Sequence, residues 1–151
     1  MGEVLSPREV FLRLVDGVCE GRVEEVLALY AEDAHVEHPF HPLGAPPLRS
    51  LDELRAHFGG GASPAGPSLR RRPAGITVHE TADPEVIVAE FRYEGTVVET
   101  GEPFTIPGVF VMRVRDGKIV ESRDYLDHLR SARARGRLGE VLDAVRDRHG
   151  D

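Results

Sequence analysis

Several features that would quickly narrow the function of a protein are missing from this chain of 151 residues. It has no tryptophan and a single cysteine, Cys19, so an internal disulfide is excluded and a reducing compartment is favoured. No apolar run approaches the ~20 residues that a membrane-spanning helix needs, and the N-terminus has no basic segment followed by an apolar one. We therefore expect a cytoplasmic protein without a membrane partner.

Positive charge is also scarce. The chain has 19 Lys and Arg against 26 Asp and Glu, a formal net charge of −7, whereas a nucleic-acid-binding protein needs a basic surface. The one basic run, Arg70–Arg72, adjoins a segment rich in Gly and Pro, and we interpret it as part of a solvated loop rather than a phosphate-binding patch. No phosphate-binding loop, nucleophile elbow or dinucleotide fingerprint is present. The sequence therefore predicts neither a nucleic-acid partner nor a cofactor.

The first part of the chain predicts two helices. Ser6 and Glu9 form a capping box at the start of the first helix, and Gly21 ends its helical pattern of apolar residues. A second, shorter helix is expected to carry four apolar residues on one face, namely Val23, Val26, Leu27 and Tyr30. Both helices are amphipathic and should therefore pack against other elements.

The rest of the chain predicts mainly strands. Residues 34–38 favour an extended segment, Ser50 is expected to cap a third helix, and the Gly- and Pro-rich segment 59–68 is a loop that could act as a lid. Four long strands should follow, near residues 74–81, 86–98, 103–115 and 118–126. A polar helical pattern over 129–151 closes the chain. Helices followed by a run of antiparallel strands indicate a single α+β domain over residues 1–151.

Residues 108–127, GVFVMRVRDGKIVESRDYLD, have the pattern of a β-hairpin with Asp116-Gly117 as its tight turn. Because alternate side chains of a strand share a face, one face should carry Val120, Ser122, Asp124 and Leu126. The other face should carry Ile119, Glu121, Arg123 and Tyr125. A carboxylate on an apolar face is either structurally paired or takes part in chemistry, so Asp124 is a candidate general acid or base.

Two segments resemble a known superfamily. LALYAEDAHVEHPF, residues 27–40, looks like its second helix and first strand, and residues 106–127 are similar to the last hairpin of limonene-epoxide hydrolases and SnoaL-like proteins. The chain is thus identified as a member of the nuclear-transport-factor-2-like superfamily, in the group of SnoaL-like polyketide cyclases, ketosteroid isomerase and limonene-epoxide hydrolase. The resemblance implies a curved antiparallel sheet and three N-terminal helices that form a cone with one deep apolar pocket, and an extra C-terminal helix. It does not name a reaction, because the superfamily hosts many.

The resemblance also implies roles for two residues. Asp124 occupies the place of an aspartate that acts as general acid or base in SnoaL-like cyclases and limonene-epoxide hydrolases. His38 aligns with the proton-shuttling aspartate of ketosteroid isomerase. An imidazole with a pKa of roughly 6.5 can take and give a proton near pH 7, so His38 is expected to assist Asp124. From the residues alone, a lone histidine is more often structural, and Asp124 could be held by an arginine or by backbone N–H groups.

Two departures from the superfamily narrow the reaction. Leu14 and Phe110 stand where ketosteroid isomerase has a tyrosine and a protonated aspartate, so steroid isomerisation by that mechanism is not expected. Limonene-epoxide hydrolases need an arginine and an aspartate two residues apart on an earlier strand. Arg92 and Glu94 have that spacing, but they would reach the pocket only if a bulge shifted their register.

Three nearby histidines, His35, His38 and His41, invite comparison with a metal site. Residues three apart on a strand face opposite ways, and no cysteine or spaced carboxylate completes a recognisable zinc set. We therefore expect no metal site.

The pocket should be apolar, which suits a polyketide, terpenoid or steroid-like ligand. Its substrate-binding residues are expected to be Leu14, Phe40, Phe58, Phe91, Tyr93, Phe104, Ile106, Phe110, Met112 and Leu126. The leading hypothesis is a small cofactor-independent enzyme in which Asp124 and His38 drive cyclisation, isomerisation, dehydration or epoxide opening. The alternative is a non-catalytic binding or dimerisation module of the same fold. Superfamily members often pair through the sheet, so a homodimer is expected.

Overall fold

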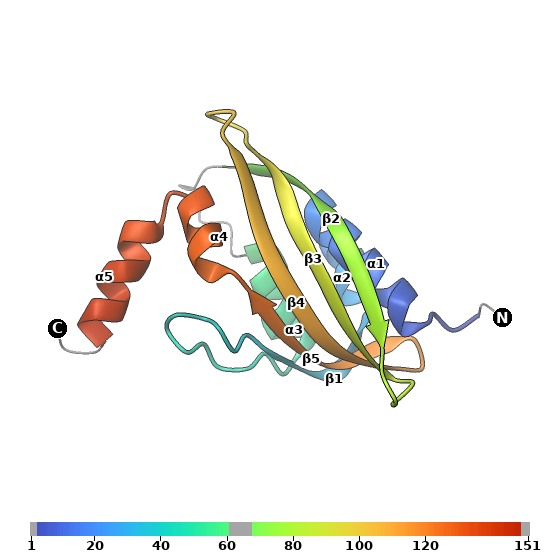
Figure 1. Cartoon of the computed structure of the whole chain (residues 1–151). Coiled ribbons are helices and arrows are strands. Elements are labelled where there is room, and N and C mark those ends of the chain that lie inside the picture. The colour runs from blue at the N-terminus through green and yellow to red at the C-terminus, as the bar shows by residue number, and fades with distance from the viewer. Residues whose placement is uncertain (1–2, 61–67, 149–151) are drawn as a thin grey trace.

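Three helices and one strand precede four consecutive long strands, and two helices close the chain (Figure 1). The computed structural model describes residues 3–60 and 68–148. The helices are α1 (Pro7–Glu20), α2 (Val23–Leu27), α3 (Leu51–Arg55), α4 (His128–Ala134) and α5 (Leu138–Arg148), and a π-helical turn, η1 (Ala56–Gly60), follows α3. The strands are β1 (Tyr30–Glu37), β2 (Leu69–Glu80), β3 (Val86–Val97), β4 (Pro103–Arg115) and β5 (Lys118–Leu126).

The strands form one curved sheet in the order β1-β5-β4-β3-β2. The meander from β2 to β5 is antiparallel, as predicted. β1 pairs with β5 in parallel, so the sheet is mixed rather than wholly antiparallel. Helices α1, α2 and α3 cover one face of the sheet (Figure 1). The predicted α+β architecture is thereby confirmed.

Helix α1 joins the helical layer to the sheet. Its capping box is formed as predicted, because Ser6 Oγ accepts from the Glu9 N–H while the Glu9 carboxylate accepts from the Ser6 N–H. Phe11 lies edge-on to Phe91, with ring centroids 5.3 Å apart, and to Phe110 at 6.0 Å. These aromatic contacts fill the middle of the core, and the cavity lies to one side of them.

The boundary between the second helix and the first strand differs from the prediction. Helix α2 ends at Leu27, and Tyr30 is the first residue of β1 rather than the last residue of a helical face. Tyr30 lies opposite Ile119 of β5. Pairing in the sheet overrides the local helical pattern there, because intrinsic helix propensity is a weak preference that tertiary contacts outweigh.

Two further elements differ from their predicted bounds. β2 starts at Leu69, so Arg70–Arg72 lie in a strand and not in a solvated loop. The predicted helix over 129–151 is divided into α4 and α5, because Gly136 adopts a φ of 67° between them. Most of the predicted lid loop, residues 61–67, lies outside the described residues.

The β4–β5 hairpin has the predicted tight turn. Asp116 and Gly117 have φ angles of 52° and 75°, the positive values that a tight two-residue turn requires. The register then shifts between Arg113 and Val114. As a result Ile119, which pairs with Val114, is fully buried. The predicted alternation, which placed Ile119 on the face of Glu121, Arg123 and Tyr125, is therefore wrong at that residue.

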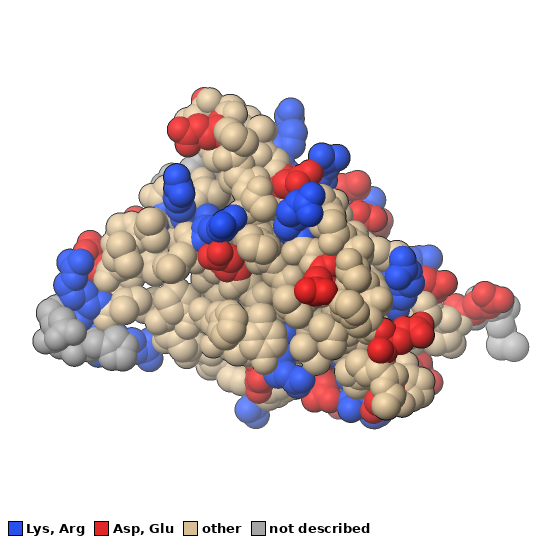
Figure 2. Space-filling model, viewed as in Figure 1, with Lys and Arg blue, Asp and Glu red and all other residues tan. Residues whose placement is uncertain are grey.

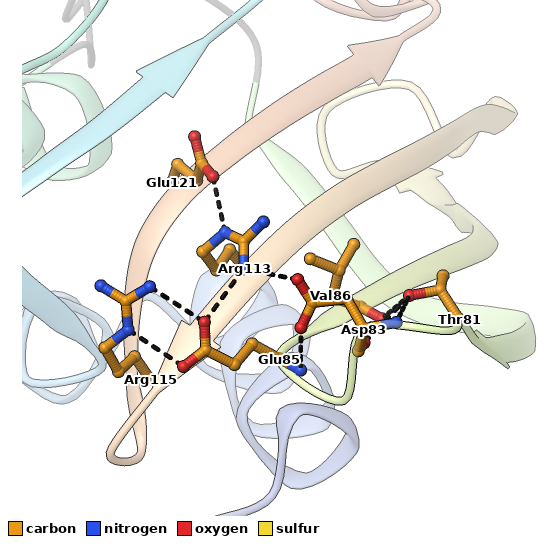
Figure 3. A network of polar contacts seen from close by, with 7 residues as sticks. All are labelled: Thr81, Asp83, Glu85, Val86, Arg113, Arg115 and Glu121. Atoms are coloured by element: carbon orange, nitrogen blue, oxygen red, sulfur yellow. Dashed lines mark hydrogen bonds and ion pairs between the residues drawn. The ribbon is translucent and has the colours of Figure 1, made fainter.

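A network of ion pairs holds the β2–β3 turn against β4 and β5 (Figure 3). Arg113 lies 2.8 Å from Asp83, 2.9 Å from Glu85 and 2.8 Å from Glu121. Arg115 donates two further hydrogen bonds to Glu85. None of these five residues lines the cavity described below, so the network supports the sheet and takes no part in the site.

The face of the sheet opposite the helices carries a broad area with few charged groups (Figure 2). A groove of about 600 Å³ on it includes Phe40, Pro107, Tyr125 and Leu129 among its lining residues. Phe40 is 66% exposed, and its ring lies 5.0 Å from that of Tyr125. Within the described ranges no helix is both long and apolar enough to cross a membrane.

Candidate active site

Asp124 lies on β5 with its side chain on the face that the helices cover. The residue is only 4% exposed and sits opposite Phe110 of β4. Ser122, two residues earlier on the same face, donates a hydrogen bond from Oγ to Asp124 Oδ1 at 2.5 Å. Burial raises the pKa of Asp124 from 3.8 to about 7, and the Ser122 bond opposes that rise only in part. The carboxyl can therefore both accept and donate a proton near neutral pH.

His38 follows directly after β1, and its side chain is 7% exposed. Its Nε2 lies 3.8 Å from Asp124 Oδ2, which is close but beyond hydrogen-bond distance. Burial, and then the neighbouring His57, His128 and His41, lower the pKa of His38 to about 4. The imidazole is therefore neutral at pH 7, which corrects the expectation that it titrates there itself.

A cluster of four histidines, His38, His41, His57 and His128, gathers beside Asp124. The ring centroids of His38 lie 4.8 Å from those of His57 and 6.2 Å from those of His128, and His41 lies 5.1 Å from His128. Burial is the main cause that lowers the pKa of each ring, so the cluster is uncharged at neutral pH. Sequence reasoning missed His57 and His128. The available signal was that each lies next to a predicted pocket residue or just beyond the hairpin.

A cavity of about 410 Å³ between the sheet and the helices is lined by Asp124 and by three histidines of the cluster, His38, His57 and His128. Five of the predicted substrate-binding residues line it, namely Leu14, Phe58, Tyr93, Phe110 and Leu126. The cavity lining is mixed rather than apolar throughout, because histidines, Tyr30 and two arginines line it together with these apolar residues.

The other five predicted residues lie elsewhere. Phe91, Ile106 and Met112 are buried in the core, because α1 packs directly over that part of the sheet. Phe104 lines a separate groove near α4, and Phe40 lies on the opposite face of the sheet. The alternation of side chains along each strand identified the inward face of the sheet. It did not identify which inward residues the helices would cover.

Tyr30 adds a hydrogen-bond donor that the sequence did not reveal. It lines the cavity, is 3% exposed, and its hydroxyl has no hydrogen-bond partner among the described residues. Burial, and then Asp124 and Tyr93, raise the pKa of Tyr30 well above its usual value, so the hydroxyl keeps its proton. A buried donor without a partner is available to a substrate. The prediction missed it because it placed Tyr30 on a helix.

The residues that limonene-epoxide hydrolases would require do not reach the cavity. Arg92 is exposed and binds Glu94 at 2.9 Å, while Glu94 also binds Arg72 at 2.6 Å. The β3–β4 register is continuous, so no bulge turns Arg92 inward. Leu14 and Phe110 lie in the cavity wall and offer no donor in place of the ketosteroid isomerase pair.

The described residues contain no group of three His, Cys, Asp or Glu arranged to hold a metal ion. His35 lies apart from the histidine cluster and contacts Glu37 at 2.9 Å. Cys19 is half-buried, and burial raises the pKa of its thiol to about 11, which disfavours a thiolate.

Comparison with known proteins places this chain in a family. Residues 11–122 match the SnoaL-like domain family. The chain belongs to the SnoaL-like family. The matched segment of this SnoaL-like domain contains Tyr30 and His38 and ends two residues before Asp124.

Individual proteins resemble this chain in sequence or in fold. The uncharacterized protein YesE of Bacillus subtilis (strain 168) is 28% identical over 137 residues, which cover 85% of this chain and 86% of YesE. A crystal structure named "putative isomerase" from Bacillus subtilis matches this SnoaL-like domain with a TM-score of 0.73 and 28% identity, over 86% of this chain and 92% of that one. A phenazine biosynthesis-related protein from Pseudomonas aeruginosa shares the fold, with a TM-score of 0.62 and 20% identity over 85% and 84% of the two chains.

Proposed function

We propose that this SnoaL-like domain is a cofactor-independent enzyme that transfers protons within a hydrophobic small molecule of polyketide, terpenoid or steroid-like character. The observation that carries the proposal is the environment of Asp124. A carboxylate kept for stability is usually paired with a cation, but the only described partner of Asp124 in hydrogen-bond distance is the Ser122 hydroxyl. A buried acid that ionises near pH 7 and faces a cavity is suited to general acid/base catalysis.

The arrangement supports a simple sequence of proton transfers. Ionised Asp124 takes a proton from a carbon next to a carbonyl group, and the electron pair moves onto the carbonyl oxygen to give an enolate. The Tyr30 hydroxyl donates a hydrogen bond to that oxygen as its negative charge develops. Asp124 then returns the proton to another carbon in an isomerisation. In a cyclisation, the enolate carbon first attacks a second carbonyl, and Asp124 protonates the resulting alkoxide.

His38 has a supporting role in this scheme. The 3.8 Å between its Nε2 and Asp124 Oδ2 is too long for a direct hydrogen bond, so one substrate atom or one water can contact both groups. A neutral imidazole can donate or accept one hydrogen bond there without adding charge to the cavity.

The experiment measures proton abstraction without knowledge of the natural substrate. A panel of hydrophobic cyclic ketones is incubated with the protein in D₂O, and loss of the α-proton signals is followed by NMR. We expect exchange above the buffer rate for at least one ketone, and a loss of about 100-fold or more in Asp124→Asn. Asp33→Asn, which changes an exposed aspartate of β1, is the matched control and should exchange normally. Equal exchange by wild type and Asp124→Asn would refute the role of Asp124.

The competing function is a non-catalytic binding module. The observation in its favour is that Leu14 and Phe110 provide no donors where ketosteroid isomerase has them. The same experiment separates the two functions, because a binding module would bind ketones of the panel and show no exchange above the buffer rate.

A further inference from the structure

Two arginines line the same cavity. Arg71 comes from β2, and Arg135 is the C-terminal cap of α4. The start of β2 and α4 lie at the same end of the sheet (Figure 1). Both side chains are half-buried, and the guanidinium of Arg71 lies 4.8 Å from the centroid of the Tyr93 ring. The cavity lining therefore combines Asp124 and several apolar side chains with two arginines.

Neither arginine has an acidic partner among residues 3–60 and 68–148. By contrast, most outward-facing arginines of the sheet are paired with carboxylates, namely Arg72, Arg92, Arg113 and Arg115. A partly desolvated cation without an anion is unfavourable, and two such cations close together repel each other. Burial, and then the charges of Arg71 and Arg137, lower the pKa of Arg135. Apart from the contact between Arg71 and the Tyr93 ring, no described contact compensates these two charges.

The two arginines do not serve Asp124 either. Burial and the Ser122 bond set the pKa of Asp124, and neither arginine shifts it. Among the described residues, Asp124 is also the only acidic one in the cavity lining. At the pH where Asp124 is protonated, the cavity carries two positive charges and no negative one, in a protein whose net charge is −7.

We infer that the cavity binds a hydrophobic carboxylic acid, with its carboxylate held by Arg71 and Arg135 and its apolar body lying toward Leu14, Phe110 and Asp124. The guanidinium group presents a planar fork of donors that matches a carboxylate, and a single negative charge suffices to relieve the repulsion between the two cations. Ser131, which also lines this part of the cavity, can add a hydroxyl donor. The inference rests on the proposed function in using the same cavity, and it specifies the substrate class as an anion rather than a neutral molecule.

The test compares two probes that share one ring system and differ in charge. Naphthoate is the anion and naphthamide its neutral counterpart, and their affinities are measured by calorimetric titration at pH 7. We expect naphthoate to bind at least about tenfold more tightly, since hydrogen bonds between charged groups are worth more than neutral ones. Arg71→Gln and Arg135→Gln should each remove most of that preference while leaving naphthamide binding unchanged. Arg71→Lys, which keeps the charge but not the fork, should retain part of it.

Matched controls exclude a general effect of charge. Arg70→Gln removes a charge from the exposed neighbour of Arg71, and Arg133→Gln removes one from the exposed surface of α4. Both controls should keep the preference for naphthoate. Equal affinity for the two probes, binding of neither probe, or equal losses in the control variants would overturn the inference.

The outcome is separate from that of the proposed function. In Asp124→Asn the preference for naphthoate should persist, because Asp124 does not hold the carboxylate. If the wild type shows no proton exchange but still prefers naphthoate, the domain is a carboxylate-binding module and not an enzyme. If exchange depends on Asp124 but naphthoate is not preferred, the proposed enzymatic function stands. Only the inference that the cavity binds a carboxylate is then refuted.

Discussion

His38 Nε2 lies 3.8 Å from Asp124 Oδ2, and the two groups titrate in the reverse of their usual order. The pKa of the carboxyl is raised to about 7, and that of the imidazole is lowered to about 4. Burial is the main cause of both shifts, because it disfavours the charged form of an acid and of a base alike. At neutral pH the carboxyl is near its midpoint and the imidazole is neutral.

The pH profile of proton exchange should therefore report Asp124. As a general base Asp124 must be ionised, so kcat/KM for ketone exchange should rise with pH and level off above about pH 7. His38→Ala should lower the rate of exchange without changing the pH at which the rise in kcat/KM occurs. A rise that disappears in His38→Ala would instead assign the titration to the imidazole, as the sequence alone had suggested.

Ser122→Ala should move the rise in kcat/KM for exchange to higher pH. The Ser122 hydroxyl donates to the ionised carboxylate and so lowers the pKa of Asp124, and its removal leaves burial unopposed. The pH profile of exchange measures the shift. Ser131→Ala is the control, since Ser131 lines the cavity without a described bond to Asp124. An unchanged profile in Ser122→Ala would show that the hydroxyl does not stabilise the charged form.

Tyr30→Phe should slow exchange without destabilising the fold. Loss of a donor to a developing oxyanion typically costs about 100-fold or more in rate. The Tyr30 hydroxyl has no partner among the described residues, so its removal breaks no described bond within the protein and the melting temperature should not fall. Tyr125→Phe, on the opposite face of the sheet, should change neither quantity. A variant of Tyr30 that exchanges at the normal rate would remove the hydroxyl from the mechanism.

Asp124→Asn should become more stable relative to the wild type as the pH rises. The pKa of Asp124 is 3.8 in the reference state and about 7 in the fold, so between these values the folded protein holds a proton that the unfolded chain has lost. The wild type therefore loses free energy of unfolding across this window, on the order of 4 kcal/mol in total, and no more above it. Asn does not titrate, and the histidines contribute equally to both proteins. Urea denaturation from about pH 5 to pH 8 measures the difference, which should stay flat for Asp33→Asn.

The homodimer expected from the sequence remains a prediction. Phe40 offers an exposed aromatic ring beside the apolar groove on the open face of the sheet, where a partner subunit would bury it. Light scattering at micromolar concentration should give the mass of a dimer for the wild type and of a monomer for Phe40→Asp. Val98→Asp, which changes another exposed apolar residue at the end of β3, should stay dimeric. A monomeric wild type would contradict the expectation.

The sequence predicted the structure best where residues close together in the chain determine the conformation. The face of Asp124 followed from strand alternation, because the register of β5 is regular from Glu121 to Leu126 and the shift lies outside that segment. Helix α1 was equally predictable because its capping box and apolar spacing lie within a few residues of one another.

The rest of the site depends on contacts between distant segments. His57 and His128 meet His38 only because η1 and α4 pack around the end of β1, and no local pattern encodes that contact. Arg71 and Arg135 lie far apart in the chain and were hidden in basic segments that suggest solvent exposure. Tyr30 was placed on the wrong element, because its spacing continues the apolar pattern of α2.

The register shift between Arg113 and Val114 has a consequence for how the chain can change. A shift of this kind adds one residue to one strand only, so it can absorb the gain or loss of a residue on the turn side of the hairpin. A single-residue deletion between the register shift and Asp124 cannot be absorbed in this way. It would turn the carboxyl to the open face of the sheet and bring a neighbour such as Arg123 inward. The spacing from Ser122 to Asp124 is thus the part of the hairpin on which the direction of the carboxyl depends.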